Sequence, residues 1–129
     1  MPDNGAALRL LKATLRLRPD RILVGEVRDG AALALLKAWN TGHPGGAATL
    51  HANSAPAGLI RMEQLVAEAT QAPMRAFIAE AIDVIVSIEK TGGSRRIKEV
   101  IRVEGLDGDR YGTVNKIIFK VVSYFLAIF

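Results

Sequence analysis

RPDRILVGE, residues 18–26, and TGHPGGAATLHANS, residues 41–54, are the two stretches that decide the fold of this chain. Each contains a short apolar run, ILV in the first and AATL in the second, of the kind found in strands covered on both faces of a parallel sheet. Glu26 lies just past the first run and His51 directly follows the second. Ligands of open α/β sheets bind beyond the carboxyl ends of the strands. We therefore expect Glu26 and His51 to lie on one rim and to line one site.

Helical periodicity surrounds these two strands. Leucines at helical spacing beside a basic stripe predict an amphipathic helix over residues 6–17, which Pro19 ends. Asp29 and Gly30 begin a second helix, and Ser54 caps a third. Pro73 begins a fourth, short helix. The second and third helices are expected to bury Ala32, Leu35, Leu36 and Trp39, and Leu59, Met62, Val66 and Ala69, respectively.

The period changes to two from Asp83 onward, where Val84, Val86 and Ile88 alternate with Ile85, Ser87 and Glu89. Turn residues at 91–94 predict a hairpin with a strand over residues 95–104, and a second turn at 107–109 returns the chain toward Tyr111. The order helix, strand, helix, strand, helix and meander predicts an α/β fold with an antiparallel edge.

Composition fits one globular domain, because half of the 129 residues are hydrophobic. The absence of cysteine excludes disulfides and thiolate zinc sites, and it fits a reducing, cytosolic compartment. No signal peptide is visible. The 17 basic and 13 acidic residues give a net charge of +4, which suits nucleic acid, anionic lipid or phosphate equally. No aromatic residue precedes Trp39 to stack on bases, which argues against direct nucleic-acid binding.

Two side chains stand out as chemistry-bearing. A carboxylate after a buried strand, such as Glu26, can hold Mg²⁺ through water or orient an attacking water, or it can simply cap the next turn. His51 can bond a phosphate oxygen or a neighbouring subunit, or it can be satisfied by backbone. A metal site on His43 and His51 lacks a third ligand nearby. Gly42 and Gly45 give their loop freedom to approach a ligand or to form a tight turn.

The two stretches together closely resemble the secretion ATPases of the RecA-like P-loop superfamily, and most of all the TrbB-type conjugative transfer ATPases. RPDRILVGE corresponds to the Walker B segment of that family and GHPGGAATLHA to its histidine box. The resemblance extends from about Leu10 to about Tyr111. It implies a partial RecA-like motor domain, with parallel core strands, flanking helices and a C-terminal antiparallel hairpin.

The resemblance also implies site residues, cofactors and partners. Glu26 is implied as the Walker B acid, catalytic and bound to Mg²⁺ through water, and His51 as the catalytic histidine-box side chain. Six further residues are implied in the vicinity of the nucleotide phosphates: Arg16, Arg18, Arg28, Gly42, His43 and Gly45. The cofactors are ATP and Mg²⁺. The family forms homo-oligomeric, hexameric rings in the cytoplasm at the inner membrane, where ATP hydrolysis powers type IV secretion, substrate transfer or pilus assembly.

The sequence departs from the family pattern in two places. No Gly-Lys-Ser or Gly-Lys-Thr occurs, so the loop that cradles phosphates is missing. We therefore expect residues 1–112 to be the C-terminal part of a motor domain, inactive alone, or an interaction module that contacts full-length subunits. Residues 113–129 form an apolar tail whose run from Ile117 is too short to span a membrane. The tail is expected to pack on an exposed sheet edge or on a membrane surface.

Overall fold

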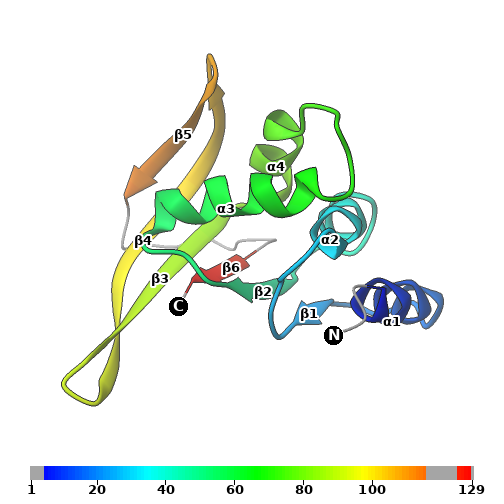
Figure 1. The fold of residues 1–129 in the computed structure, drawn as a ribbon, viewed down its shortest axis with the longest axis horizontal. Coiled ribbons are helices and arrows are strands. Elements are labelled where there is room, and N and C mark those ends of the chain that lie inside the picture. Colours follow the sequence, from blue (N-terminus) through cyan, green and yellow to red (C-terminus); the bar gives the residue numbers. More distant parts are fainter. Residues whose placement is uncertain (1–4, 116–124, 129) are drawn as a thin grey trace.

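The structure, a computed structural model, describes residues 5–115 and 125–128. A mixed sheet carries a layer of helices, with α2, α3 and α4 packed together and α1 beside α2 (Figure 1). The helices are α1 (Ala6–Arg16), α2 (Ala31–Asn40), α3 (Ala55–Ala67) and α4 (Arg75–Ala81). The strands are β1 (Leu23–Val24), β2 (Ala47–Leu50), β3 (Val84–Thr91), β4 (Ser94–Asp107), β5 (Arg110–Asn115) and β6 (Phe125–Ile128).

The strand order is β1-β2-β6-β3-β4-β5. The pairs β1–β2, β2–β6 and β6–β3 are parallel, whereas β3–β4 and β4–β5 are antiparallel. The predicted α/β class, with parallel core strands and an antiparallel hairpin beyond them, is therefore confirmed. Tight turns at 92–93 and at 108–109 join the antiparallel strands directly, whereas the chain passes through α2 between the parallel strands β1 and β2.

The described part of the tail lies inside the sheet and not on its edge. β6 pairs with β2 on one side and with β3 on the other, so that Thr49 and Val86 both lie opposite Ala127. The expected packing of residues 125–128 on an exposed edge is thus wrong. The physical reason is that β2 and β3 leave room for one strand, and unpaired backbone groups in mid-sheet would be costly. Residues 116–124 and 129 lie outside the described residues.

The predicted helical stripes form the core. Trp39, Leu35 and Leu36 of α2 pack in one cluster with side chains of α3, among them Leu59, Met62, Leu65 and Val66. Ala69 is an exception. It was expected to be buried, but α3 ends at Ala67 and Ala69 is exposed.

Two strand predictions need correction. Leu23 was expected to be covered on both faces, yet it is 71% exposed, because β1 ends the sheet and only β2 pairs with it. In β3 the period-two pattern correctly predicts a strand but not its burial. All four residues from Val84 to Ser87 are buried, because this part of β3 lies between β6 and β4 in the interior of the sheet.

Gly46 fixes the approach of α2 to β1. A Cβ at this position would lie 2.0 Å from Trp39 Nε1 and 2.6 Å from the Ile22 carbonyl oxygen. Trp39 Nε1 itself donates to that oxygen at 3.4 Å. Only glycine lets the loop pass between the helix and the strand and enter β2 in register with β1.

Candidate functional site

The structure brings Glu26 and His51 together. His51 Nε2 lies 3.0 Å from Glu26 Oε1, within ion-pair distance. The two residues follow neighbouring parallel strands, β1 and β2, which pair as Leu23 with Ala47 and Val24 with Ala48. Each residue therefore stands on the carboxyl rim of the sheet, where open α/β sheets bind ligands.

Thr49 positions this pair. Its carbonyl oxygen accepts a hydrogen bond from Val27 N at 2.8 Å, and its hydroxyl donates to the Gly25 carbonyl. The backbone on both sides of Glu26 is thereby tied to β2 beyond the last paired residue of β1. The position of the Glu26 backbone relative to β2 is therefore set by these two contacts with Thr49.

Arg28 is the second partner of Glu26, with its Nε 3.5 Å from Glu26 Oε2. The carboxylate thus sits between an imidazole and a guanidinium, and both partners are largely exposed. Exposed ion pairs contribute little to stability, typically about 0–1 kcal/mol. A carboxylate accepts about four hydrogen bonds, so Glu26 retains capacity to bind water or a hydrated cation.

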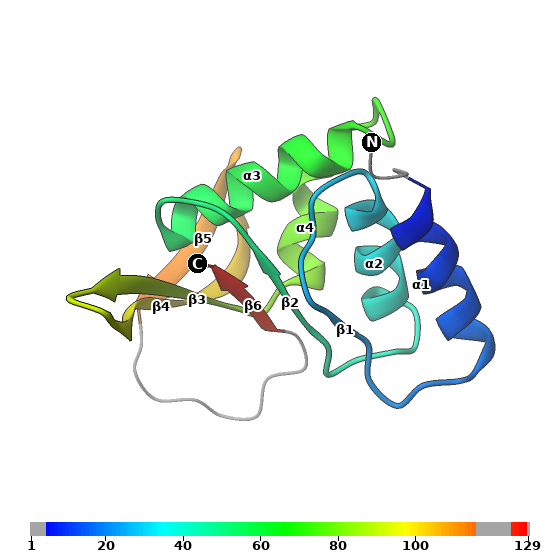
Figure 2. The same cartoon turned by 60° about the horizontal axis from the view of Figure 1, so that its bottom comes forward.

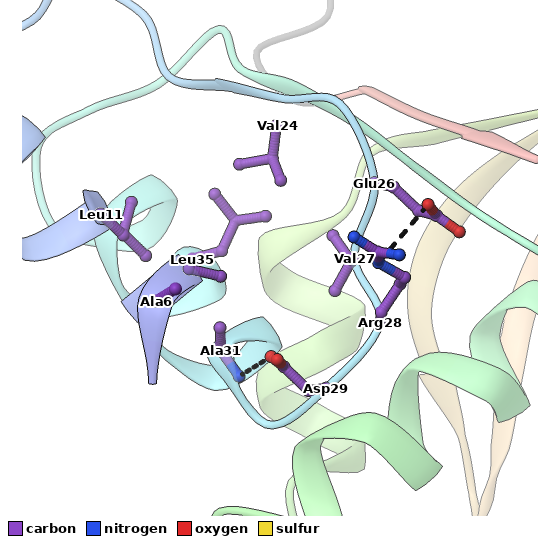
Figure 3. A pocket seen from close by; sticks show the side chains of 10 residues that line it. Ala6, Leu11, Val24, Glu26, Val27, Arg28, Asp29, Ala31 and Leu35 are labelled. Carbon is purple, nitrogen blue, oxygen red and sulfur yellow. Dashed lines mark hydrogen bonds and ion pairs between the residues drawn. The ribbon is translucent and has the colours of Figure 1, made fainter. Parts of the chain in front are cut away.

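Glu26 separates two pockets. The first, here called the helix pocket, has a volume of about 450 Å³ and lies between α1, α2 and residues 24–29. Figure 3 shows its apolar floor, with Leu11, Val24 and Leu35, and the ion pair of Glu26 and Arg28 at its side.

The second, here called the rim pocket, has a volume of about 440 Å³ and lies beyond the carboxyl ends of the strands. It contains the Glu26–His51 pair. Its lining residues are Gly25, Glu26, Thr49, His51, Ile88, Glu89, Lys90 and Arg95. Four of these come from the β3–β4 hairpin, which the sequence reading left out of the site. The Gly-Gly turn was the available signal, because a two-residue turn at 92–93 sets the register that places Lys90 opposite Arg95.

None of the six residues implied near the phosphates lines the rim pocket. Gly42, His43 and Gly45 precede β2, whereas His51 follows it, and four strand residues span about 13 Å. The ring of His43 bonds the Pro19 carbonyl at 3.2 Å through Nδ1, at the amino edge of the sheet.

Arg16 and Arg18 end α1 or follow it, and neither lines the helix pocket or the rim pocket. Of the six residues, only Arg28 contacts Glu26. The roles of all six near the phosphates stay predictions.

The comparison with protein families covers both stretches of the site. The family described as "Type II/IV secretion system protein" matches residues 4–91, more than half of the chain. The chain belongs to this family. The match includes Glu26, His51 and the first strand of the hairpin, and it ends where β3 ends.

Relatives within this secretion family agree with the predicted TrbB-type resemblance, which is confirmed. The chain is 64% identical over 111 residues to the conjugal transfer protein TrbB of Rhizobium radiobacter, covering 86% of this chain and 34% of that protein. It is 37% identical over 97 residues to the type IV secretion system protein VirB11 of Bartonella quintana, covering 70% and 27%. The chain therefore spans about a third of the length of the relatives it matches.

A solved structure supports the same family fold. The VirB11 ATPase from the Brucella suis type IV secretion system, in complex with sulphate, superposes with a TM-score of 0.71 at 28% identity, covering 83% of this chain and 35% of that one. Within the part of the chain that the structure describes, no helix is long and apolar enough to cross a membrane.

Proposed function

We propose that this secretion-family chain supplies the Walker B and histidine-box side of an ATP-hydrolysing site that drives conjugative type IV secretion. The observation that supports this most is the contact of 3.0 Å between Glu26 and His51 on the carboxyl rim. The relatives named as conjugal transfer proteins and as an ATPase support the same activity.

Within this site, Glu26 orients the attacking water, since its carboxylate can accept a hydrogen bond from that water. His51 and Arg28 hold the carboxylate in place. His51 fixes the direction of that carboxylate through Nε2 and, when its other ring nitrogen also carries a proton, offers Nδ1–H to a phosphate oxygen. Arg28 balances the negative charge of Glu26.

ATP and Mg²⁺ are the cofactors this proposal requires. No group of three or more His, Cys, Asp or Glu side chains among the described residues is placed to hold a metal ion. One carboxylate, Glu26, nevertheless suits Mg²⁺, which often binds through one or two carboxylates together with water and substrate phosphates. When bound, Mg²⁺ neutralises charge on the phosphates.

The loop that cradles the phosphates must come from outside this sequence, which contains no Gly-Lys-Ser or Gly-Lys-Thr. We therefore place the activity in a homo-oligomeric, hexameric ring at the cytoplasmic face of the inner membrane, beside the conjugation machinery. The isolated chain is expected not to hydrolyse ATP.

A second candidate function is a catalytically inactive module that contacts full-length subunits. Its support is the exposure of three leucines near α1 and β1: Leu10 at 69%, Leu17 at 81% and Leu23 at 71%. Capture of full-length TrbB by the tagged chain, lost in a Leu17→Ser Leu23→Ser variant, would favour this function.

The test of the first function uses a chimera in which the matching segment of this chain replaces that of Rhizobium radiobacter TrbB. Glu26→Gln keeps the shape of the side chain and removes its charge. ATP hydrolysis and plasmid transfer between cells should both fall. Glu68→Gln is the matched control, because Glu68 is exposed at the end of α3 and lines neither pocket.

A further inference from the structure

The β3–β4 hairpin extends past the rim that carries Glu26 and His51. Leu50, the last residue of β2, and Ser87 of β3 both pair with Ile128 of β6, so Leu50 and Ser87 lie at the same level in the sheet. Residues 88–91, with their partners on β4, continue beyond this level, and Figures 1 and 2 show the hairpin projecting from the body of the molecule. The base of this extension forms one wall of the rim pocket.

Two cations face each other on that wall. Lys90 pairs with Arg95 across the hairpin, and both line the rim pocket. Like charges directly opposite on antiparallel strands are destabilising. Neither of them forms an ion pair with another described residue. The next pair along the hairpin does form one, with Arg96 Nη2 2.7 Å from Glu89 Oε1.

The other charged groups of the pocket are already matched. Glu26 contacts His51 and Arg28, and Glu89 contacts Arg96. Lys90 and Arg95 therefore leave an uncompensated positive charge in a pocket of about 440 Å³. That volume is within the range of small-molecule sites, roughly 300–1,000 Å³. An anion in the pocket would relieve the repulsion between the two cations.

We propose that Lys90 and Arg95 bind the phosphate chain of a nucleotide and hold it over the Glu26–His51 pair. This assignment rests on the proposed function of the same site. An arginine fork bonds two phosphate oxygens at once, and a lysine adds a compact charge. In P-loop proteins a glycine-rich loop binds the phosphates. Here the two cations bind part of the phosphate chain, on the side of the pocket opposite Glu26.

The test is a titration of the 129-residue chain with sodium tripolyphosphate, in which backbone amide shifts are measured by NMR. We expect saturable shifts at Gly25, Thr49 and Lys90 at millimolar ligand. Arg95→Gln and Lys90→Gln should each weaken binding about tenfold, as expected for one lost charge-assisted contact. Lys98→Gln is the control. It makes the same charge change on the same hairpin, but Lys98 does not line the rim pocket.

The proposal is overturned if tripolyphosphate produces no saturable shifts in the unchanged protein. It is overturned equally if Lys98→Gln weakens binding as much as Arg95→Gln, which would show attraction to net charge alone. Thermal unfolding of each variant shows whether the fold is kept. A parallel titration with ATP should shift the same amides, and failure of ATP to do so would overturn the assignment to a nucleotide.

Failure here is distinguishable from failure of the proposed function. Normal ATP hydrolysis by the Glu26→Gln chimera would reject the proposed function even if Arg95→Gln weakened tripolyphosphate binding. Conversely, a Glu26-dependent ATPase with tripolyphosphate binding indifferent to Lys90 and Arg95 would reject only the role of these two cations.

Discussion

At the scale of single residues, the site depends on one contact, which joins His51 Nε2 and Glu26 Oε1 at 3.0 Å. An ionised carboxylate has no proton to donate, so a hydrogen bond across this contact needs the proton on His51 Nε2. The Thr49 hydroxyl and carbonyl hold the backbone on both sides of Glu26. We therefore expect His51 first to position the Glu26 carboxylate, which would otherwise rotate.

Substitution of His51 separates positioning from acid chemistry. A glutamine side chain keeps an N–H donor, while alanine removes it. In the TrbB chimera we expect His51→Ala to lower ATP hydrolysis by about a hundredfold, as for a catalytic group displaced by about 1 Å. His51→Gln should recover part of that loss. Equal loss in both variants would mean that the imidazole acts as a proton donor and that positioning contributes little.

A second residue cluster joins α3, α4 and β5. Arg75 bonds Glu63 with both ends of its fork, Nε to Oε1 at 2.9 Å and Nη2 to Oε2 at 3.0 Å, and donates to the Asp109 carbonyl at 2.6 Å. The guanidinium carbon of Arg75, Cζ, lies over the Tyr111 ring, 5.9 Å from the ring centroid. The hydrogen bonds from Arg75 hold the pKa of Glu63 below its usual 4.5, against the opposing effect of burial. Burial in turn raises the pKa of Tyr111.

This cluster gives a pH-dependent stability. Because the folded pKa of Glu63 is depressed, its contribution is present above pH 4.5 and is lost as the pH falls through the folded pKa. Arg75→Gln should lower the free energy of unfolding at neutral pH, since it removes both hydrogen bonds to the Glu63 carboxylate. In urea titrations the difference from the unchanged protein should shrink below pH 4.5. Arg61→Gln, at an exposed arginine on α3, is the control; a constant difference at every pH would contradict the account.

At the scale of elements, β6 is the part that joins two otherwise separate groups of strands. β1 and β2 lie on one side of it, and β3, β4 and β5 on the other. Among the described strands, β2 and β3 meet only through β6. Because β6 lies between β2 and β3, residues 125–128 are needed to hold the sheet together.

Truncation after Asn115 tests this. Without β6, the facing backbone groups of β2 and β3 lose their partners, so their amides should exchange with solvent faster than those of α3. We expect a lower midpoint of urea unfolding and a greater tendency to aggregate through the open strand edges. Hydrogen exchange read by mass spectrometry gives the measurement. Unchanged protection in β2 and β3 would contradict the pairing.

Elements with a local signal were predictable from the sequence, and those set by distant partners were not. Ser54 indeed caps α3, with its hydroxyl accepting from Ala57 N at 3.2 Å, and Gly92 and Gly93 form the hairpin turn with positive φ. The place of β6 and the exposure of Leu23 depend on which strands become neighbours. No local pattern carries that information.

At the scale of the whole molecule, the rim pocket brings together residues that lie far apart in the sequence, from Glu26 to Arg95. Glu26 and His51 were predictable partners, because each follows a short apolar strand. The Gly-Gly turn makes the pairing of Lys90 with Arg95 predictable, but not their place in the pocket, because they reach it only through a hairpin that overhangs the rim. The same folding places His43 at the opposite edge, where its ring bonds Pro19.

The most direct test of the account compares ATP hydrolysis by the isolated chain, the TrbB chimera and its Glu26→Gln variant under saturating ATP and Mg²⁺. We expect no turnover by the isolated chain, steady turnover by the chimera, and a loss of about a hundredfold or more in the variant, as for removal of a group that acts on the attacking water. The Glu68→Gln control should keep the chimera's rate. A Glu26→Gln chimera that hydrolyses ATP at the unchanged rate would contradict the central claim.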